Sequence, residues 1–263
     1  MRSEEITALV LTFNEEANLY CCLDRLRWVP RVVVMDSGST DRTLAICEGF
    51  PNVSVFHREF DSFAGQCNAG LDHIETEWVL SMDADYLIGK DFATLVATLP
   101  EDSVGFWFPF RYCIHGSPLR ACLYPPRTVL YRRAMATYRN DGHGHRVEVA
   151  GEVTDVDVTI DHDDRKPLSR WLDSQRKYAA LEAEKLMAER HPNGWPDRLR
   201  KMIWPAAPAA FVYTLFVKRL VLDGWPGLFY ALQRTYAEML LSLELLERKL
   251  TSSAKQRDRE IDS

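Results

Sequence analysis

The sequence lacks the marks of several large classes of protein. No apolar run reaches the ~18 residues that a membrane-spanning helix needs, and two prolines interrupt the most apolar stretch, 203–217. The six cysteines form neither a CxxC pair nor a zinc-binding spacing, which favours reduced thiols. The first residues contain no signal-peptide core. These absences predict a cytoplasmic protein without a transmembrane segment.

The chain also lacks the net positive charge that is typical of nucleic-acid-binding proteins. Its 263 residues carry a formal net charge of -6, and an acidic chain is by default a poor nucleic-acid binder. The charge is uneven, because residues 198–250 hold eight Lys or Arg and only four Asp or Glu. A basic and apolar C-terminal third favours an anionic membrane surface as a partner, and we expect no nucleic acid.

Short apolar runs alternate with helical patterns over the first 85 residues. The runs are rich in β-branched residues, as buried strands are. Strands that alternate with helices predict an α/β fold with a parallel sheet, and ligands of such sheets bind at the carboxyl ends of the strands. Ser39 or Thr40 is expected to cap the second helix. The strands are expected at 6–12, 31–35, 53–56 and 78–82, and the helices at 19–28, 40–49 and 66–74.

The alternation of strand and helix patterns ends after residue 85. Strands are expected at 105–110 and 128–131, with an edge strand at 156–160, and a long helix is expected to begin at Pro167. The last helix carries a narrow apolar stripe, which suits either a core or partner seam or contact with a membrane. We therefore expect three segments: a catalytic domain over 1–165, a helical amphipathic extension over 166–250 and a flexible tail over 251–263. The stripe consists of Leu232, Tyr236, Met239, Leu243, Leu246 and Leu250.

Two carboxylates stand two residues apart just after the fourth apolar run. Residues at this spacing on an extended strand point to the same side, so Asp83 and Asp85 are expected to emerge together where the strand ends. Paired carboxylates suit a hard divalent cation that holds a phosphate. The pair therefore predicts a site for Mg²⁺ or Mn²⁺.

Four motifs in order resemble those of family 2 glycosyltransferases, which have the GT-A (Rossmann-like) fold. Within that family the chain is similar to the lipopolysaccharide-core heptose β-1,4-glucosyltransferase group, and the similarity returns at 177–183 and 222–227. The motifs are Leu11-Thr12-Phe13-Asn14-Glu15-Glu16, Asp36-Ser37-Gly38-Ser39-Thr40-Asp41, Gln66-Cys67-Asn68-Ala69-Gly70 and Asp83-Ala84-Asp85.

The resemblance implies an inverting, metal-dependent transfer of a sugar from a nucleotide-sugar donor. A UDP-sugar is the expected donor, and a lipid-linked or lipopolysaccharide-core glycan at the inner face of the cytoplasmic membrane is the expected acceptor. Asp36 would accept the uracil N3–H, and Asn68 would donate to donor oxygens. The expected donor site comprises Thr12, Phe13, Asn14, Glu15, Asp36, Ser37, Gly38, Asn68, Asp83, Ala84, Asp85 and Arg111, with Asp85, Asp83 and His145 as metal ligands.

Three positions depart from the pattern of the group. Cys67 stands where the group often has an arginine, so Arg111, Arg127 or Arg146 is expected to hold the diphosphate. Tyr86 stands where the group has a glutamate. Arg146 takes the place of the glutamate in the usual His-Glu pair, and the catalytic base is therefore expected at one of the flanking acids. These two acids are Asp141 and Glu148.

Other interpretations remain open. Asp36 and Asp41 could be turn and cap residues, because aspartate favours such positions. A nucleotidyltransferase of sugar-nucleotide metabolism also uses Asp-bound Mg²⁺, but it would need a Gly-rich basic loop, and residues 11–18 contain no Gly, Lys or Arg. A non-catalytic scaffold of the same fold fits the three departures, whereas the retained Asp83/Asp85 pair argues against it. The last helix could also join two copies of the chain into a homo-oligomer.

Overall fold

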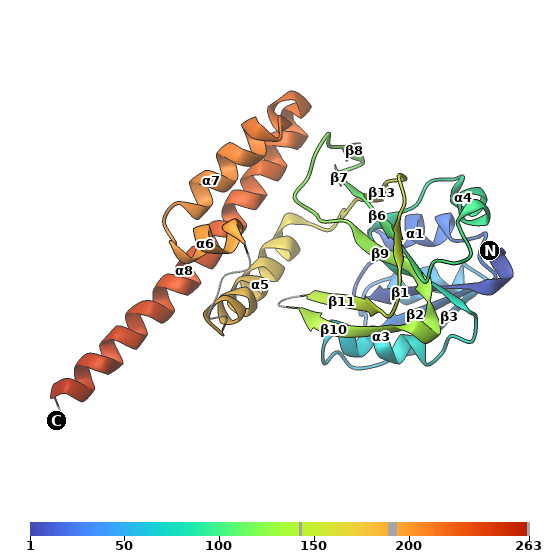
Figure 1. Cartoon of the computed structure of the whole chain (residues 1–263), viewed down its shortest axis with the longest axis horizontal. Helices are drawn as coiled ribbons and strands as arrows, with labels where there is room; N and C mark the ends of the chain where they lie inside the picture. The colour runs from blue at the N-terminus through green and yellow to red at the C-terminus, as the bar shows by residue number, and fades with distance from the viewer. Residues whose placement is uncertain (142–143, 189–193, 262–263) are drawn as a thin grey trace. The chain divides into compact units, whose positions relative to one another are not determined.

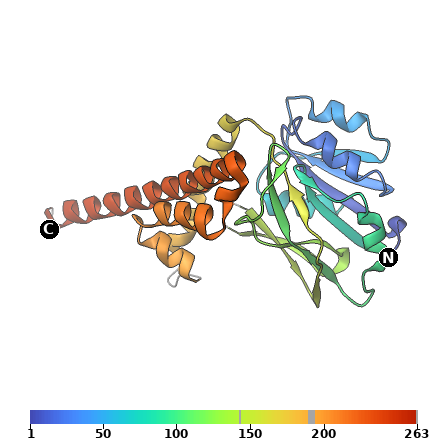
Figure 2. The ribbon, with the colours of Figure 1, turned by 90° about the horizontal axis from the view of Figure 1, so that it is seen from above.

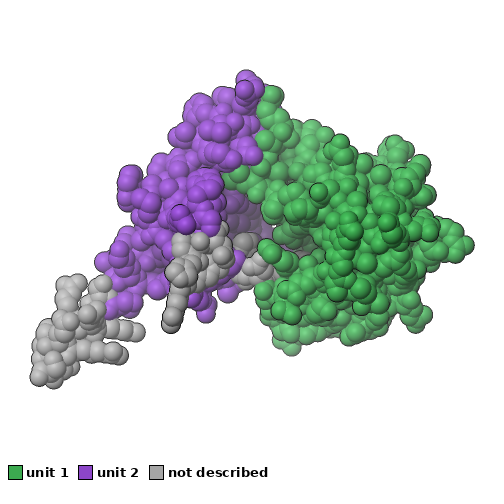
Figure 3. Space-filling view, viewed as in Figure 1, with its two compact units in different colours: residues 1–166 green, residues 167–263 purple. Residues whose placement is uncertain are grey.

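The chain folds into two compact units. The computed structural model describes residues 1–141, 144–188 and 194–261. The units are Met1–Lys166 and Pro167–Ser263, which Figure 3 colours separately. The first is a mixed α/β domain and the second is helical (Figure 1). The α/β fold followed by a helical extension, as predicted from the sequence, is confirmed.

The main sheet of the first unit is built from the predicted apolar runs. Its strands are β1 (Ile6–Thr12), β2 (Arg31–Asp36), β3 (Val53–His57), β4 (Trp78–Asp83), β6 (Gly105–Phe108), β9 (Arg127–Arg132) and β12 (Val153–Asp155). They lie in the order β12-β6-β9-β4-β1-β2-β3. The strands β1 to β4 run parallel, and β9 runs antiparallel to β4 and to β6. The carboxyl ends of β1, β2 and β4 therefore meet at one edge.

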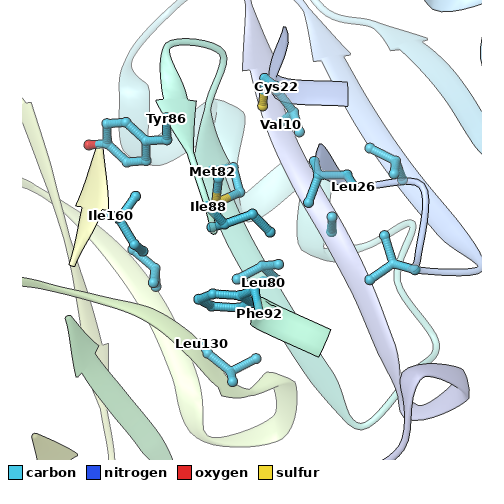
Figure 4. Close-up of a cluster of buried hydrophobic side chains, with 14 of the residues drawn as sticks. Val10, Cys22, Leu26, Leu80, Met82, Tyr86, Ile88, Phe92, Leu130 and Ile160 are labelled. Atoms are coloured by element: carbon cyan, nitrogen blue, oxygen red, sulfur yellow. The ribbon is translucent and has the colours of Figure 1, made fainter. Parts of the chain in front are cut away.

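Helices cover both faces of this sheet, so alternate residues of one strand enter different cores. Ala8 and Val10 of β1 pack with α1 and α4, whereas Leu9 packs with α3. Figure 4 shows part of the first core, where Leu80 lies beside Phe92. Burial on both faces is why the strands read as continuous apolar runs. The helices are α1 (Leu19–Arg25), α2 (Thr43–Glu48), α3 (Phe63–Leu71) and α4 (Phe92–Thr98), with short 3-10 turns η1 (Ser3–Glu5) and η2 (Arg133–Met135).

Two predicted helix starts are wrong, and local hydrogen bonds explain why. Neither Ser39 nor Thr40 caps α2, because the Thr43 amide donates to Asp41 Oδ1 at 2.9 Å and the helix begins there. The third helix begins earlier than expected, because the Ser62 hydroxyl accepts from the Gly65 amide at 3.0 Å. Serine and aspartate are both strong caps, and the sequence offered several of them in each loop.

Two small sheets complete the first unit. One joins β10 (Ala136–Asp141) to β11 (Gly144–Val149), and the other has the order β5-β13-β7-β8. The edge strand expected at 156–160 is wrong, since β12 ends at Asp155 and the next strand begins at Ile160. Strand β13 pairs with β5 so that His162 lies opposite Tyr86. The remaining bounds are β5 (Tyr86–Leu87), β7 (Phe110–Ile114), β8 (Ser117–Pro118) and β13 (Ile160–His162).

The second unit is a set of helices packed on one long helix. A small core of Ala183, Leu186, Leu241 and Leu245 joins α5 to α8. Arg200 of α6 donates to Glu238 of α8 through Nη2 at 2.7 Å. Figure 2 shows α8 from above, with the shorter helices along it. The elements are α5 (Leu168–Ala188), α6 (Trp195–Lys201), α7 (Ala206–Val212), the π-helical turn η3 (Tyr213–Val217), η4 (Leu220–Asp223) and α8 (Gly224–Ile261).

Two features of these helices bear on the expected extension and tail. Helix α8 continues past Leu250, where its apolar stripe ends, to Ile261. Ala, Lys, Arg, Gln and Glu make up six of the eleven residues 251–261, and these residues propagate a helix well. None of the helices in the described part of the chain combines the length and apolar composition that crossing a bilayer requires.

Candidate donor-binding site

The loops that follow β1 and β2 are joined into one structure at the carboxyl edge of the sheet. Asn14, with a positive φ of 54°, accepts through Oδ1 from the Thr40 amide at 2.7 Å. The Glu15 amide donates to the Thr43 hydroxyl at 2.7 Å. Asparagine tolerates this left-handed conformation better than most residues. Phe13 remains about half exposed beside these bonds.

Asp36 organises the turn that follows β2. Its Oδ1 accepts from the hydroxyls of Thr12 and Ser39, and its Oδ2 accepts from the amides of Gly38 and Ser39 at 2.9 Å each. Burial raises the pKa of Asp36, but these donors outweigh it and hold the pKa below its usual value. The structure thus supports the interpretation of Asp36 as a turn residue. Its contact with a uracil stays a prediction, and a base N–H would share an oxygen that already has two donors.

The chain turns directly after β4, and this turn carries the second aspartate of the pair. Asp83 ends β4 and is partly exposed, while Ala84 is buried. Asp85 is mostly buried, and its Oδ2 lies 3.2 Å from Nε2 of His162. Burial alone would raise the pKa of Asp85, but the His162 charge and hydrogen bond, with Lys166, lower it to about 2.

His162 is a residue of this site that the sequence analysis missed. Its ring is enclosed by Tyr86, Tyr112 and Tyr124, with centroid distances of 5.4, 4.7 and 4.8 Å. Burial lowers the pKa of His162, but Asp85 outweighs this and raises it above its usual value. The available signal was the run His-Asp-Asp-Arg-Lys at 162–166, which places five ionisable side chains directly after an expected edge strand.

One atom of each of these two side chains has no partner in the part of the chain that the structure describes. Among the described residues, Asp85 Oδ1 and His162 Nδ1 are buried and make no hydrogen bond. Such atoms are costly unless something binds them. The described residues contain no ready-made group of three metal-binding side chains. Carboxylate oxygens nevertheless suit Mn²⁺ or Mg²⁺, and an imidazole nitrogen beside them favours Mn²⁺ of the two.

The predicted ligand His145 and the predicted base Asp141 have side chains outside the described part of the structure. Their backbones lie in β11 and β10, which pair with each other and pack against α3. His162 is therefore the histidine that the described side chains place at Asp85. Glu148 is exposed, and it pairs with Arg139 across the β10–β11 ribbon at 2.9 Å. Neither acid is shown beside Asp85.

A second set of charges lies between the β1 loop and the segment after β13. Lys166 Nζ donates to Glu15 Oε1 at 2.7 Å and lies 4.0 Å from Asp85 Oδ2. Asn18 Nδ2 donates to Glu15 Oε2 and to Asp164 Oδ1, both at 3.0 Å. Burial raises the pKa of Glu15 to about 7, although Lys166 opposes the rise. Glu15 is thus a partner of Lys166, and its predicted contact with the donor stays a prediction.

The structure separates the candidate arginines. Arg111 is half exposed and forms a two-pronged ion pair with Asp161, at 2.7 and 3.0 Å. Arg127 is mostly buried, with its guanidinium 4.8 Å from the centre of the Tyr124 ring. Burial lowers the pKa of Arg127, but Tyr86, Tyr124 and the two aspartates of the pair raise it above its usual value. Arg127, not Arg111, is the arginine within the field of that pair.

Two other predicted donor contacts have structural partners. Asn68 holds β10, because its Nδ2 donates to the Tyr138 carbonyl and its Oδ1 accepts from the Tyr138 amide, both at 3.0 Å. A sequence pattern does not show this pairing, and the role of Asn68 in donor binding stays a prediction, because Nδ2 carries a second hydrogen. The Ser37 hydroxyl accepts from Gln66 Nε2 at 3.0 Å. Cys67 is buried in the α3 core, and the Tyr86 hydroxyl bonds to that of Tyr124.

A parallel sheet with an acidic, histidine-containing site at its carboxyl edge is the arrangement of a phosphate- or nucleotide-binding α/β enzyme. Residues 7–139, about half of the chain, match the family model described as Glycosyl transferase family 2. The chain belongs to this family. The family and the enzyme class predicted from the four motifs are thereby confirmed.

The chain is also similar to proteins that are named glycosyltransferases. It is 28% identical over 142 residues to the lipopolysaccharide core biosynthesis glycosyltransferase LpsC of Rhizobium meliloti, a match that spans 51% of this chain and 50% of LpsC. It is 22% identical over 266 residues to an uncharacterized glycosyltransferase of Rickettsia felis, covering 95% and 92%. The similarity to LpsC agrees with the predicted lipopolysaccharide-core group.

Similar solved structures share little sequence with the chain. TarS of S. aureus, solved in complex with UDP-GlcNAc, has a TM-score of 0.48 and 15% identity, over 95% of this chain and 92% of that one. Glucosyl-3-phosphoglycerate synthase of Mycobacterium tuberculosis, solved with Mn²⁺, UDP and glucosyl-3-phosphoglycerate, has a TM-score of 0.46 and 15% identity, over 72% and 82%.

Proposed function

We propose that the chain transfers a sugar from a UDP-sugar to a lipid-linked or lipopolysaccharide-core glycan, with inversion and with Mg²⁺ or Mn²⁺. The observation that carries the proposal is the mostly buried pair of Asp85 Oδ2 and His162 Nε2, which lie 3.2 Å apart, as two ligands of one cation do. Such a pair at the carboxyl edge of a parallel sheet is where a cation that holds a diphosphate is expected. The unit Met1–Lys166 would contain this chemistry.

Asp85, Asp83 and His162 would hold the cation. When bound, it would neutralise charge on the departing diphosphate as a Lewis acid. Arg127 supports the same task, because its fixed positive charge is mostly buried and its pKa is raised by Asp83 and Asp85. The joined loops of β1 and β2 would form the rigid wall that receives the nucleoside, with the half-exposed Phe13 beside the base.

Inversion requires a base that takes the proton of the acceptor hydroxyl as this oxygen attacks the anomeric carbon. The bond to the diphosphate breaks in the same displacement. Asp141 and Glu148 remain our candidates for the base, since an ionised carboxylate can perform this step. Glu148 is accessible from solvent, as a group that meets an incoming acceptor must be.

Binding of UDP to the purified protein tests the proposal. Calorimetric titration should give binding in the presence of Mn²⁺ and much weaker binding with EDTA. A scaffold without catalytic function would bind UDP equally poorly in both. A nucleotidyltransferase would instead prefer a nucleoside triphosphate, although the acidic β1 loop with Glu15 and Glu16 offers it no phosphate-binding cation. Mass spectrometry of the glycolipids of a deletion strain would then identify the acceptor.

We also propose that the second unit rests on an anionic membrane. Large apolar side chains are exposed between 204 and 225, with Trp204 and Trp225 at 77% and 82% of their full accessibility. Lys218 and Arg219 lie in the same stretch. Exposed tryptophans with basic neighbours are typical of interfacial binding to anionic lipid. Flotation with anionic vesicles at low salt should carry the protein upward, and Lys218→Glu with Arg219→Glu should leave it in the soluble fraction.

The apolar stripe of α8 suits a second copy of the chain. Its members alternate in steps of four and three, which is a coiled-coil seam, and they are exposed while Leu241 and Leu245 on the other side are buried. We assign the stripe to a homo-oligomer contact. Light scattering should give a multiple of the 30.3 kDa chain mass, and Met239→Glu with Leu243→Glu should give a monomer.

A further inference from the structure

Lys166 is a mostly buried ammonium among carboxylates. Its side chain retains 16% of its accessibility. Its Nζ lies 2.7 Å from Glu15, 3.4 Å from Asp164 and 4.0 Å from Asp85. Three carboxylates within 4.0 Å of Nζ pair with a charged ammonium, so Lys166 places a positive charge beside the aspartate pair.

The acids around Lys166 are also held by other groups. Asn18 Nδ2 donates to both Glu15 and Asp164, and Asn18 Oδ1 accepts from the Arg165 amide at 2.9 Å. The Lys166 amide donates to Asp164 Oδ1 at 3.1 Å. Glu15, Asp164 and Asn18 are thus joined by hydrogen bonds that do not involve the Lys166 ammonium. Holding the β1 loop to the segment after β13 is therefore not the sole role of the ammonium.

The contacts of the two Asp85 oxygens indicate a second role for the Lys166 ammonium. The Oδ2 atom of Asp85 faces both His162 and Lys166, whereas Oδ1 has no partner among the described residues. Two positive groups therefore share one oxygen of the carboxylate that the cation would use. A dication placed at Asp85 would meet the repulsion of an ammonium only a few ångströms away.

We propose that Lys166 is the resident counter-cation of the donor site, and that it makes binding of the divalent cation depend on the diphosphate of the donor. This assignment rests on the proposed function. Without the diphosphate, Lys166 neutralises Glu15 and Asp85 and opposes a dication. With it, the negative charge of the diphosphate lets the ammonium and the dication occupy the site together. Cation and nucleotide then strengthen each other's binding by the same factor, as linkage requires.

The assignment is tested by titrating the protein with Mn²⁺ in the presence and in the absence of UDP. Electron paramagnetic resonance measures the free ion at each step. Lys166→Gln removes the charge and keeps a donor for Glu15, and Lys166→Met removes both. Each should tighten Mn²⁺ binding to the UDP-free protein by roughly tenfold or more, as expected for loss of a unit charge at this distance. Each should also reduce the enhancement that UDP produces. Lys166→Arg should behave as the wild type.

Arg165→Met is the matched control, because it removes the same charge from the adjacent residue, which pairs with Asp163. It should change Mn²⁺ affinity by less than about twofold. A purely structural lysine would lower stability in the two neutral variants without tightening Mn²⁺ binding, and unchanged or weaker binding in both would overturn the assignment. A wild-type protein that binds no Mn²⁺ even with UDP would overturn the proposed function itself.

Discussion

Asp36 and Asp85 both lie where a parallel strand of the main sheet ends, and both are largely buried, yet their surroundings differ. The oxygens of Asp36 accept from the hydroxyls of Thr12 and Ser39 and from two backbone amides. Asp85 faces cationic side chains on one oxygen and, among the described residues, nothing on the other. A carboxylate whose oxygens all accept hydrogen bonds stabilises its own turn, whereas one with an unpartnered oxygen can still bind a ligand. The motifs predict that both aspartates bind the donor, whereas their hydrogen bonds differ, so we expect their replacement to have different effects.

The largest effect is expected at Asp85. Asp85→Asn should abolish transfer and Mn²⁺-dependent UDP binding, because loss of a charged cation ligand costs several kcal/mol of transition-state stabilisation. Calorimetry with UDP and a thermal melt measure binding and folding separately. Asp161→Asn, on the neighbouring β13, is the control and should keep both. Near-normal turnover in Asp85→Asn would contradict the assignment.

Loss of the base should act on turnover and spare donor affinity. Either Asp141→Asn or Glu148→Gln is expected to lower kcat by about 10²–10⁴-fold, because a general base acts only in the transition state. UDP affinity, measured in the same variants, should be nearly unchanged. Full turnover in both variants would place the base elsewhere, and Asp155 would be the next acid to replace.

Arg127 and Arg111 provide a matched pair of substitutions, and the expected effect on UDP binding is of intermediate size. Arg127→Met should weaken Mn²⁺-dependent UDP binding by roughly tenfold or more, because a charged hydrogen-bonding group in a mostly buried position contributes about 1.5–3 kcal/mol. Arg111→Met, which breaks a half-exposed ion pair with Asp161, should change binding by less than about threefold. Equal losses of UDP affinity in the two variants would contradict the assignment of Arg127, and not Arg111, to the donor site.

The smallest effect is expected at Asp36 and concerns stability. Asp36→Asn should lower the free energy of unfolding by about 1–3 kcal/mol at pH 7, because its donors lose a charged acceptor. The pKa of Asp36 is lowered from 3.8, so its contribution is complete above that pH and is lost as the pH falls through the lower value. Urea unfolding of both proteins should show the difference shrinking below about pH 3.8. A constant difference across this range would argue against the turn role.

Much of the fold follows from local patterns in the sequence. The parallel strands are apolar because both of their faces are covered, and the aspartate pair follows the fourth of them as expected. Helix starts were predicted less well, because several side chains in each loop could serve as the cap and only tertiary contacts select one, as with Asp41 at α2.

The composition of the site depends on pairings that no local pattern contains. His162 reaches Asp85 only because β13 pairs with β5, and Lys166 reaches Glu15 across 151 positions of the chain. The motif of Asn68 predicts a contact with the donor but does not show that its amide also bonds to the backbone of β10. Residue type indicated which chemistry was available, and strand register decided which side chains meet.

The central claim is that the incompletely satisfied corner at Asp85 and His162 holds the cation. Crystals grown with UDP and Mn²⁺, measured at a wavelength where manganese scatters anomalously, test it directly. The account predicts an anomalous peak within coordination distance of Asp85 and His162, and none at Asp36. Bound UDP without a peak at Asp85, or a peak held by other side chains, would contradict it.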